Sequence, residues 1–175
     1  MAGKLYLIGR PLIDIRNNAR IEFGDNVSLR SDNKGYHINM HSPVKLFVQG
    51  ENTLLKIGNN TTIFGTCIHA YRHISIGNNC LIAANCQIME GHGHDLSFSN
   101  VENRINTTGM DNIKPIIIED NVWICANTIV LPGVKIGYGS IITANSVVNK
   151  DIPPMVIAGG NPAIIIKDYD GSSPR

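Results

Sequence analysis

Two histidines lie one residue apart in the segment Gly91-His92-Gly93-His94-Asp95. An imidazole titrates near neutral pH, so such a side chain can act as a general base that takes the proton of a hydroxyl group. A histidine in an exposed loop is also often only a solvated side chain. The residues alone therefore leave three hypotheses: His94 is a base, His92 is the base, or neither histidine reacts.

The cysteines and the other histidines show no metal or disulfide signature. The cysteines, at positions 67, 80, 86 and 125, contain no C-x-x-C pair and have no histidine at zinc-finger spacing. The remaining histidines pair as His69 with His73 and as His37 with His41. We therefore expect neither a disulfide framework nor a structural zinc site.

Length and charge limit the classes of partner. The chain has 175 residues, with 15 Lys and Arg against 14 Asp and Glu. Such a balance provides no field that would hold nucleic acid or an anionic membrane, so we expect a small-molecule partner. No uncharged apolar run approaches the length of about 18 residues typical of a membrane span, which favours a cytoplasmic protein. One domain over residues 1–175 is the simplest organisation.

A six-residue period dominates the C-terminal half of the chain. Its aliphatic members are Ile118, Ile124, Val130, Ile136, Ile142 and Val148. The residues three places later are Asn121, Asn127, Gly133, Gly139, Asn145 and Asp151. Asparagine and glycine enter the left-handed backbone region at low cost, so tight corners are expected there. Each unit therefore reads as a short strand followed by a corner, and three units would close one triangular coil.

The same phase continues upstream and fixes the expected fold class. It puts Cys67, Cys80 and Cys86 at a small inward position, which predicts that these cysteines fill the core. An opening phrase of the repeat recurs at Ile21, Leu55, Ile74, Ile116 and Val134, which predicts about five stacked coils. We therefore expect an all-β chain of parallel strands. Helix is expected only in a short C-terminal tail, about residues 160–175.

Breaks in the phase predict three irregular segments. One extra residue in the hexads predicts a bulge near residues 68–72. About 24 residues leave the stack between Ile88 and Ile118, which predicts a protruding loop over about residues 90–114. Long loops in compact domains are often functional, and this one carries the histidine pair at its root. A second excursion, residues 31–43, lacks a comparable motif.

From about Leu55 to Lys167 the sequence resembles the hexapeptide-repeat acyltransferases, and within them the maltose, galactoside and capsular polysaccharide O-acetyltransferases. The matching segments stand in family order: Ile76-Gly77-Asn78-Asn79, Leu81-Ile82-Ala83-Ala84-Asn85, Asn121-Val122-Trp123-Ile124, Leu131-Pro132-Gly133-Val134-Lys135-Ile136-Gly137, Ser146-Val147-Val148-Asn149-Lys150-Asp151-Ile152-Pro153 and Gly160-Asn161-Pro162-Ala163. The resemblance implies a left-handed parallel β-helix, an exception to the usual right-handed crossover. It also implies a homotrimer with active sites between subunits, acetyl-CoA as the acyl donor and no metal. The acceptor it implies is a hydroxyl of a sugar, a sugar nucleotide or a polysaccharide precursor.

The resemblance also suggests roles for the residues that act on the acyl group. The segment His92-Gly93-His94-Asp95-Leu96 matches the family's Asp-Gly-His motif, so His94 inherits the role of base and His92, in place of the aspartate, would line the site. An oxyanion forms on the thioester carbonyl, and a donor must point at it. The matching donor is the backbone N–H of Ala126. Trp123 either lines the site or packs on a coil surface.

Positions for the acyl donor and the acceptor follow in the same way. The residues that match the family's cofactor contacts are Ala144, Asn149 and Lys150, and Lys167 is the cation nearest the C-terminal turn. Lys150 equally fits a solvated surface charge.

The acceptor side lacks the asparagine and aspartate that relatives carry. His69, Tyr71 and Arg72, at the expected bulge, are the candidates in their place, although Arg72 also fits an ordinary surface position. Asn85 is a fourth candidate, and its place on the corner phase favours a structural role.

Three rival functions stay open. The γ-class carbonic anhydrases share this fold and bind zinc through histidines, two of which are five residues apart, and no histidine pair here has that spacing. An N-acetyltransferase acting on an amino sugar is the second rival. A non-catalytic β-helix is the third, although it would not require a long histidine-bearing loop.

Overall fold

The structure is a computed structural model that describes residues 3–169. Within these residues the chain forms three sheets that run along one axis. Sheet A contains β1 (Leu5–Ile8), β4 (Val27–Arg30), β7 (Thr62–Phe64), β10 (Leu81–Ile82), β13 (Trp123–Ile124), β16 (Ile141–Ile142), β18 (Val156–Gly159) and β19 (Ile164–Asp168). Sheet B contains β2 (Leu12–Ile15), β5 (Lys45–Val48), β8 (Cys67–Ala70), β11 (Gln87–Met89), β14 (Ile129–Val130) and β17 (Val147–Val148). Sheet C contains β3 (Arg20–Phe23), β6 (Leu54–Ile57), β9 (His73–Ile76), β12 (Ile116–Ile118) and β15 (Lys135–Ile136).

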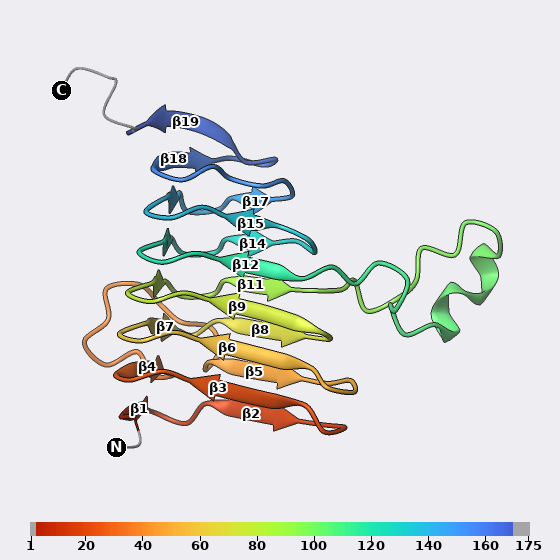
Figure 1. Cartoon of the computed structure of the whole chain (residues 1–175), viewed down its shortest axis with the longest axis horizontal. Helices are drawn as coiled ribbons and strands as arrows, with labels where there is room; N and C mark the ends of the chain where they lie inside the picture. The colour runs from red at the N-terminus through yellow and green to blue at the C-terminus, as the bar shows by residue number, and fades with distance from the viewer. Residues whose placement is uncertain (1–2, 170–175) are drawn as a thin grey trace.

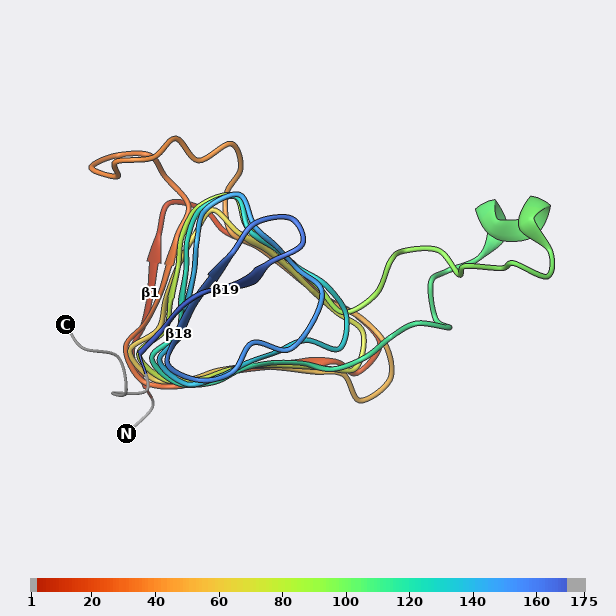
Figure 2. The ribbon, with the colours of Figure 1, turned by 90° about the horizontal axis from the view of Figure 1, so that it is seen from above.

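The three sheets form the sides of a triangular prism, as the view along its axis shows (Figure 2). Consecutive strands pass from sheet A to B to C, and each strand pairs in parallel with the strand one coil away. The stack of coils is seen from the side in Figure 1. Only the final pair among the described strands, β18 with β19, is antiparallel. The expected all-β, left-handed parallel β-helix is therefore confirmed.

The hexad has the physical basis that the sequence suggests. The repeated aliphatic residues from Ile118 to Val148 are at most 1% exposed and form a continuous core. At the corners, Asn121, Asn127 and Asn145 have φ between 59° and 60°, and the glycines at 133 and 139 also have positive φ. Asp151 is an exception, because its backbone stays outside the left-handed region and its carboxylate instead accepts the Lys135 N–H at 2.8 Å.

Two expectations about the coils were wrong. Sheet B has six strands, so six coils stack within the described residues instead of five. The opening phrase of the repeat falls on the strands of sheet C, and the sixth coil has no such strand. It contacts sheet C only through an isolated bridge between Ile136 and Ile152. Over residues 160–169, the described part of the tail, there is no helix, and Ile164–Asp168 form β19; the long loop instead contains the 3-10 helix η1 (Val101–Asn106). Residues 170–175 of the expected tail lie outside the described residues.

The phase break contains the expected bulge after Ile68, and a shortened hexad that was not expected precedes it. Strand pairing aligns Ile68 with Ile88, so only five residues separate Ile63 from Ile68 and eight separate Ile68 from Ile76. Thr66 fills the inward position and is fully buried, since its hydroxyl reaches two backbone carbonyls. Cys67 consequently begins β8 facing outward, so its expected role as a core filler is wrong.

Two loops leave the prism at different corners. The first, residues 31–43, connects β4 of sheet A to β5 of sheet B, and we call it the flap. The second, residues 90–114, connects β11 of sheet B to β12 of sheet C, and we call it the arm. Figure 2 shows the two projecting in different directions. No helix among residues 3–169 is long and apolar enough to cross a membrane.

Candidate functional site

The root of the arm is fixed by a fully buried carboxylate. Glu90 has no exposed surface, and its side chain accepts the backbone N–H groups of Tyr71, Arg72 and His73 at 2.7 to 2.8 Å. Its own carbonyl accepts the N–H of Lys114, at the other end of the arm, at 3.3 Å. A buried charge is tolerated only when it is well hydrogen-bonded, so this residue joins the arm to the coil beneath it.

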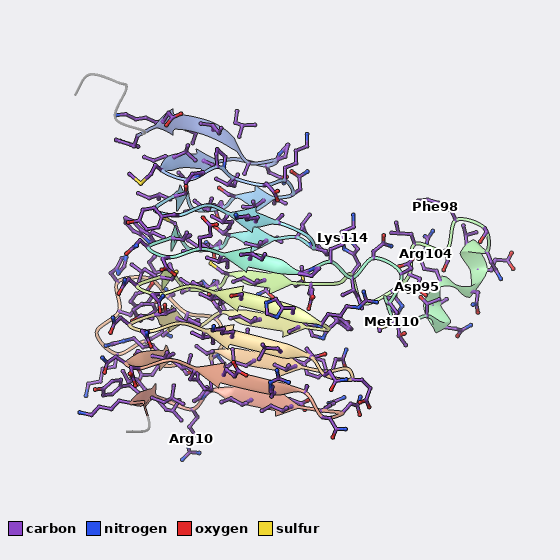
Figure 3. The ribbon with its side chains drawn as sticks, in the orientation of Figure 1. Arg10, Asp95, Phe98, Arg104, Met110 and Lys114 are labelled. Carbon is purple, nitrogen blue, oxygen red and sulfur yellow. The ribbon has the colours of Figure 1, made fainter. Side chains whose placement is uncertain are left out.

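Beyond the root, the two sides of the arm are cross-linked around the histidine motif. Asp95 donates its N–H to the Thr107 hydroxyl at 2.8 Å, and its carboxylate accepts the N–H of Asp111 at 3.2 Å. Gly109 has φ +76°, and a Cβ there would lie 2.8 Å from the backbone nitrogen of His94. Figure 3 shows Lys114 where the arm leaves the prism, with Asp95 and Arg104 farther out. The backbone of His94 therefore lies between the Glu90–Lys114 hydrogen bond at the root and the hydrogen bonds that Asp95 makes across the arm.

His94 is exposed and borders a cavity of about 510 Å³ that Val101, Arg104 and Ile105 also line. The Arg104 guanidinium donates to the carbonyl of Leu96 at 2.7 Å, which fixes η1 against the segment that carries the histidine. His92 is exposed too. The arrangement leaves both imidazoles accessible to a hydroxyl group.

Replacement of Glu90 by glutamine should destabilise the protein. The amide NH2 would face at least one of the N–H donors that the carboxylate now satisfies, which should cost about 1–3 kcal/mol of unfolding free energy. For a protein of this size that corresponds to a fall in Tm of about 2–4 °C per kcal/mol, which thermal denaturation followed by circular dichroism would measure.

Glu119→Gln is the matched control. The Glu119 carboxylate also accepts a backbone N–H, that of Tyr138 at 2.7 Å, and pairs with Lys135, but it is partly exposed. Its loss should cost about 1 kcal/mol or less. Equal Tm values for the two variants would contradict the role given to Glu90.

The corner between sheets A and B gathers three of the residues matched to the family. Trp123, Ala126 and Ala144 line one cavity of about 380 Å³, together with residues of the flap. Within residues 3–169, the N–H groups of Ala126 and Ala144 donate no hydrogen bond, whereas neighbouring amides do, such as Cys125 to Ile142 at 2.9 Å. Free N–H groups at a cavity wall can hold a developing oxyanion or an amide carbonyl.

Other predicted residues lie at the corner between sheets B and C, with the arm. Asn149 and Lys150 are exposed and follow β17 there. Lys167 is on β19, opposite Ile157, and its ammonium lies 4.7 Å from the Tyr169 ring centroid. A single chain therefore does not bring the predicted cofactor residues together.

The acceptor candidates are divided in the same way. His69 stacks on Phe47, with ring centroids 4.4 Å apart, and packs against the Tyr71 ring at 4.3 Å with a tilt of 32°. Burial lowers the pKa of His69 to about 4, so this imidazole is neutral at physiological pH. Tyr71 is only 6% exposed and lies against Gly91, at the root of the arm, whereas Arg72 is exposed. These three residues share the corner from which His94 projects.

Asn85 lies at the corner between sheets A and B, where its side chain has a structural role. It has φ 65°, its side-chain oxygen accepts the His41 N–H at 2.9 Å, and its amide donates to the Asn39 carbonyl at 2.9 Å. Both partners belong to the flap. Asn85 therefore fastens the flap to the coil, and it also borders a second cavity of about 500 Å³ with His41 and Lys45.

The cysteines should differ in reactivity according to their burial. Cys80 and Cys86 are at most 2% exposed, and burial raises the pKa of the Cys86 thiol to about 11. Cys67 and Cys125 are half-buried, and burial raises the pKa of both thiols as well. At pH 8 we therefore expect slow labelling of at most Cys67 and Cys125 in the native protein, because the thiolate is the reactive form.

Thiol titration with and without denaturant, followed by mass mapping of the labelled peptides, would measure this difference. Labelling of Cys86 at the same rate in the folded and the unfolded protein would contradict its place in the core.

Sequence reasoning predicted the excursion over residues 31–43 but missed its contacts with the coils, and it missed the role of Glu90. Glu90 lies next to the histidine motif, and an acidic residue between a core strand and a loop was the available signal. The flap residue Tyr36 stacks on Phe64 with centroids 4.1 Å apart, a contact between distant segments that no local pattern announces.

Comparison with known proteins agrees with this architecture. The family model described as bacterial transferase hexapeptide (six repeats) matches residues 115–150. A protein of Schizosaccharomyces pombe named as an acetyltransferase is 38% identical over 135 residues, which are 77% of this chain and 56% of the relative. The chain thus spans little more than half of that relative's length.

Two further proteins carry more specific names. The galactoside O-acetyltransferase of Lactococcus lactis is 33% identical over 143 residues, which are 73% of this chain and 66% of that protein. The solved structure of a maltose O-acetyltransferase from Clostridium difficile is 30% identical, with a TM-score of 0.50 over 91% of this chain and 71% of that one. With the repeat, the fold and these relatives in agreement, the chain belongs to the hexapeptide-repeat acetyltransferases.

Proposed function

We propose that this protein is an acetyl-CoA-dependent O-acetyltransferase that modifies a hydroxyl of a sugar, a sugar nucleotide or a polysaccharide precursor. Two observations together carry the proposal. An accessible histidine lies on the cross-linked arm, and at another corner a cavity contains two N–H groups that donate no hydrogen bond within residues 3–169. These are the two components that acyl transfer from a thioester needs, a base and an oxyanion donor.

In this mechanism His94 takes the proton of the acceptor hydroxyl while the oxygen attacks the thioester carbonyl carbon. The N–H of Ala126 stabilises the oxyanion that develops. The C–S bond then breaks, the carbonyl re-forms as an ester, and the imidazolium returns its proton to the leaving thiolate. The products are an acetyl ester and free CoA, so atoms and charge balance without a metal or a redox partner.

The division of these residues between two corners supports a homotrimer. The arm corner of one subunit would meet the flap corner of the next, which is a contact between different surfaces. Such heterologous contacts close into rings when the rotation permits, and a trimer is the ring implied by the family. Asn149 and Lys150, which share the arm corner, would then approach Ala144 of the adjacent subunit and bind the donor between them.

The acceptor wall would be supplied from the arm corner. His69, Tyr71 and Arg72 lie near the root of the arm that carries His94. Phe47 and Tyr71 pack against the ring of His69, and Tyr71 is itself buried, so the exposed guanidinium of Arg72 is the group best placed to donate hydrogen bonds to a sugar. We place Asn85 outside the acceptor site, because both functional groups of its side chain already bind the flap.

The direct test is release of free thiol from acetyl-CoA in the presence of a panel of pyranosides, sugar nucleotides and their amino-sugar analogues. Ester formation on a hydroxyl, seen as alkali-labile acetyl by mass spectrometry, would support the proposal. Alkali-stable amide products would establish the N-acetyltransferase alternative. Stoichiometric zinc in the purified protein, with hydration of carbon dioxide, would establish the carbonic-anhydrase alternative.

A further inference from the structure

The flap has no role in the mechanism so far, although it closes one end of the cavity that contains Ala126. Tyr36 stacks on Phe64 with an interplanar angle of 10°, and Ile38 lies beside it at the same cavity. Leu81 and Trp123 form the walls from the coils. This half-open cavity of about 380 Å³ is lined mainly by aliphatic and aromatic side chains.

Backbone N–H groups of successive coils form a row along the corner between sheets A and B. Asn127 and Asn145 donate to the carbonyls of Ala84 and Ala126, which puts Ala84, Ala126 and Ala144 at equivalent turns of successive coils. The first of the three meets the flap: burial raises the pKa of Tyr36, and a hydrogen bond with the backbone of Ala84 opposes that rise. Tyr36 therefore lies at the Ala84 end of this row, and the N–H groups of Ala126 and Ala144, which donate no hydrogen bond among the described residues, follow on the next two coils.

This order gives a direction to a bound thioester. If the carbonyl lies at Ala126 and the CoA arm passes Ala144, as the proposed function requires, the remote end of the acyl group points towards Tyr36 and Phe64. An acetyl methyl is about the size of a water molecule, which occupies about 30 Å³ in the liquid. The cavity is therefore larger than an acetyl group needs.

We propose that this cavity is an acyl pocket, so that the protein accepts straight-chain acyl groups of about three to four carbons as well as acetyl, with the flap setting the limit of chain length. The inference rests on the proposed function, because it takes the thioester carbonyl to be at Ala126. An apolar pocket that buries a methylene strengthens binding by about 4-fold. A site shaped for acetyl alone would instead reject each added methylene by about 10- to 200-fold.

Binding to the wild-type protein without acceptor tests the proposal, because no transfer can occur. Calorimetric titration with acetyl-CoA, propionyl-CoA and butyryl-CoA should give dissociation constants that fall by about 4-fold per methylene. Equal or rising values along the series would overturn the acyl pocket while leaving acetyl transfer intact. Failure of all three thioesters to bind would instead overturn the proposed function.

Variants that fill the cavity give the second test. Ile38→Trp, from the flap, and Leu81→Trp, from the coil, should each abolish the gain for butyryl-CoA while acetyl-CoA still binds. Two variants from different segments guard against a local folding defect. Ile117→Trp is the control, since this 40% exposed isoleucine lies on sheet C and outside the cavity, and it should preserve the whole series.

An apolar group of the acceptor is the alternative occupant of this cavity. If Ile38→Trp raises the KM of nitrophenyl glycosides relative to that of methyl glycosides, and leaves the acyl series unchanged, the cavity holds an apolar group of the acceptor. That result would overturn the acyl pocket. An unchanged KM for both glycosides, together with loss of the butyryl gain, would support it.

Discussion

Substitution of His94 by alanine should lower kcat by about two to four orders of magnitude, the usual contribution of a general base. Binding of acetyl-CoA should hardly change, because the residues proposed to contact the donor lie on the coils and not on the arm. Activity of the wild-type protein should also fall as the pH is lowered, because an imidazolium cannot accept the hydroxyl proton. Thiol release for kcat and calorimetry for donor affinity separate these effects.

His92→Ala is the matched control, since it removes an exposed imidazole two residues away on the same arm. It should cost less, because the family has an aspartate there that need not carry the proton. Wild-type turnover in His94→Ala with none in His92→Ala would shift the role of base to His92. Full activity in both variants would remove the proposed mechanism altogether.

Mixing two inactive variants should restore activity if the site is shared between subunits. His94→Ala lacks the base, and Ala126→Pro lacks the N–H donor. Proline at position 126 removes an N–H that makes no hydrogen bond within the described residues. In a ring of three, each mixed trimer contains one site with both groups intact. Random co-refolding of equal amounts should therefore recover about a quarter of the wild-type activity.

Light scattering on each variant and on the mixture checks that trimers form. Mixing the folded variants without exchange of subunits is the control and should recover nothing. If the two groups acted within one chain, co-refolding would also recover nothing. An active monomer would rule out the shared site directly.

The sequence predicts the prism well because each hexad by itself contains the residues that specify its strand and its corner. One aliphatic residue per hexad and an asparagine or glycine at each corner specify inward and turning positions without reference to distant residues, and Ile118 to Val148 behave accordingly. The arm is predicted for the same reason, since only a loop can absorb the residues between Ile88 and Ile118.

The details that the sequence did not predict depend on contacts between coils. Thr66 rather than Cys67 faces inward because its hydroxyl reaches the Phe64 and Ala83 carbonyls, which restores the stack after a shortened hexad. Glu90 acts through backbone groups about twenty residues earlier, at the turn that begins with Tyr71. The division of the candidate site between two corners likewise emerges only when the coils are closed.

The stacking of the coils has a consequence for how such a protein can change over time. Each strand pairs only with strands of the coils directly above and below it, so the energetics resemble those of a linear array with nearest-neighbour terms. A coil gained or lost at an end leaves the neighbours of the central coils unaltered. The length of the prism and the chemistry at its corners can therefore diverge independently, which lets one architecture serve many acceptors.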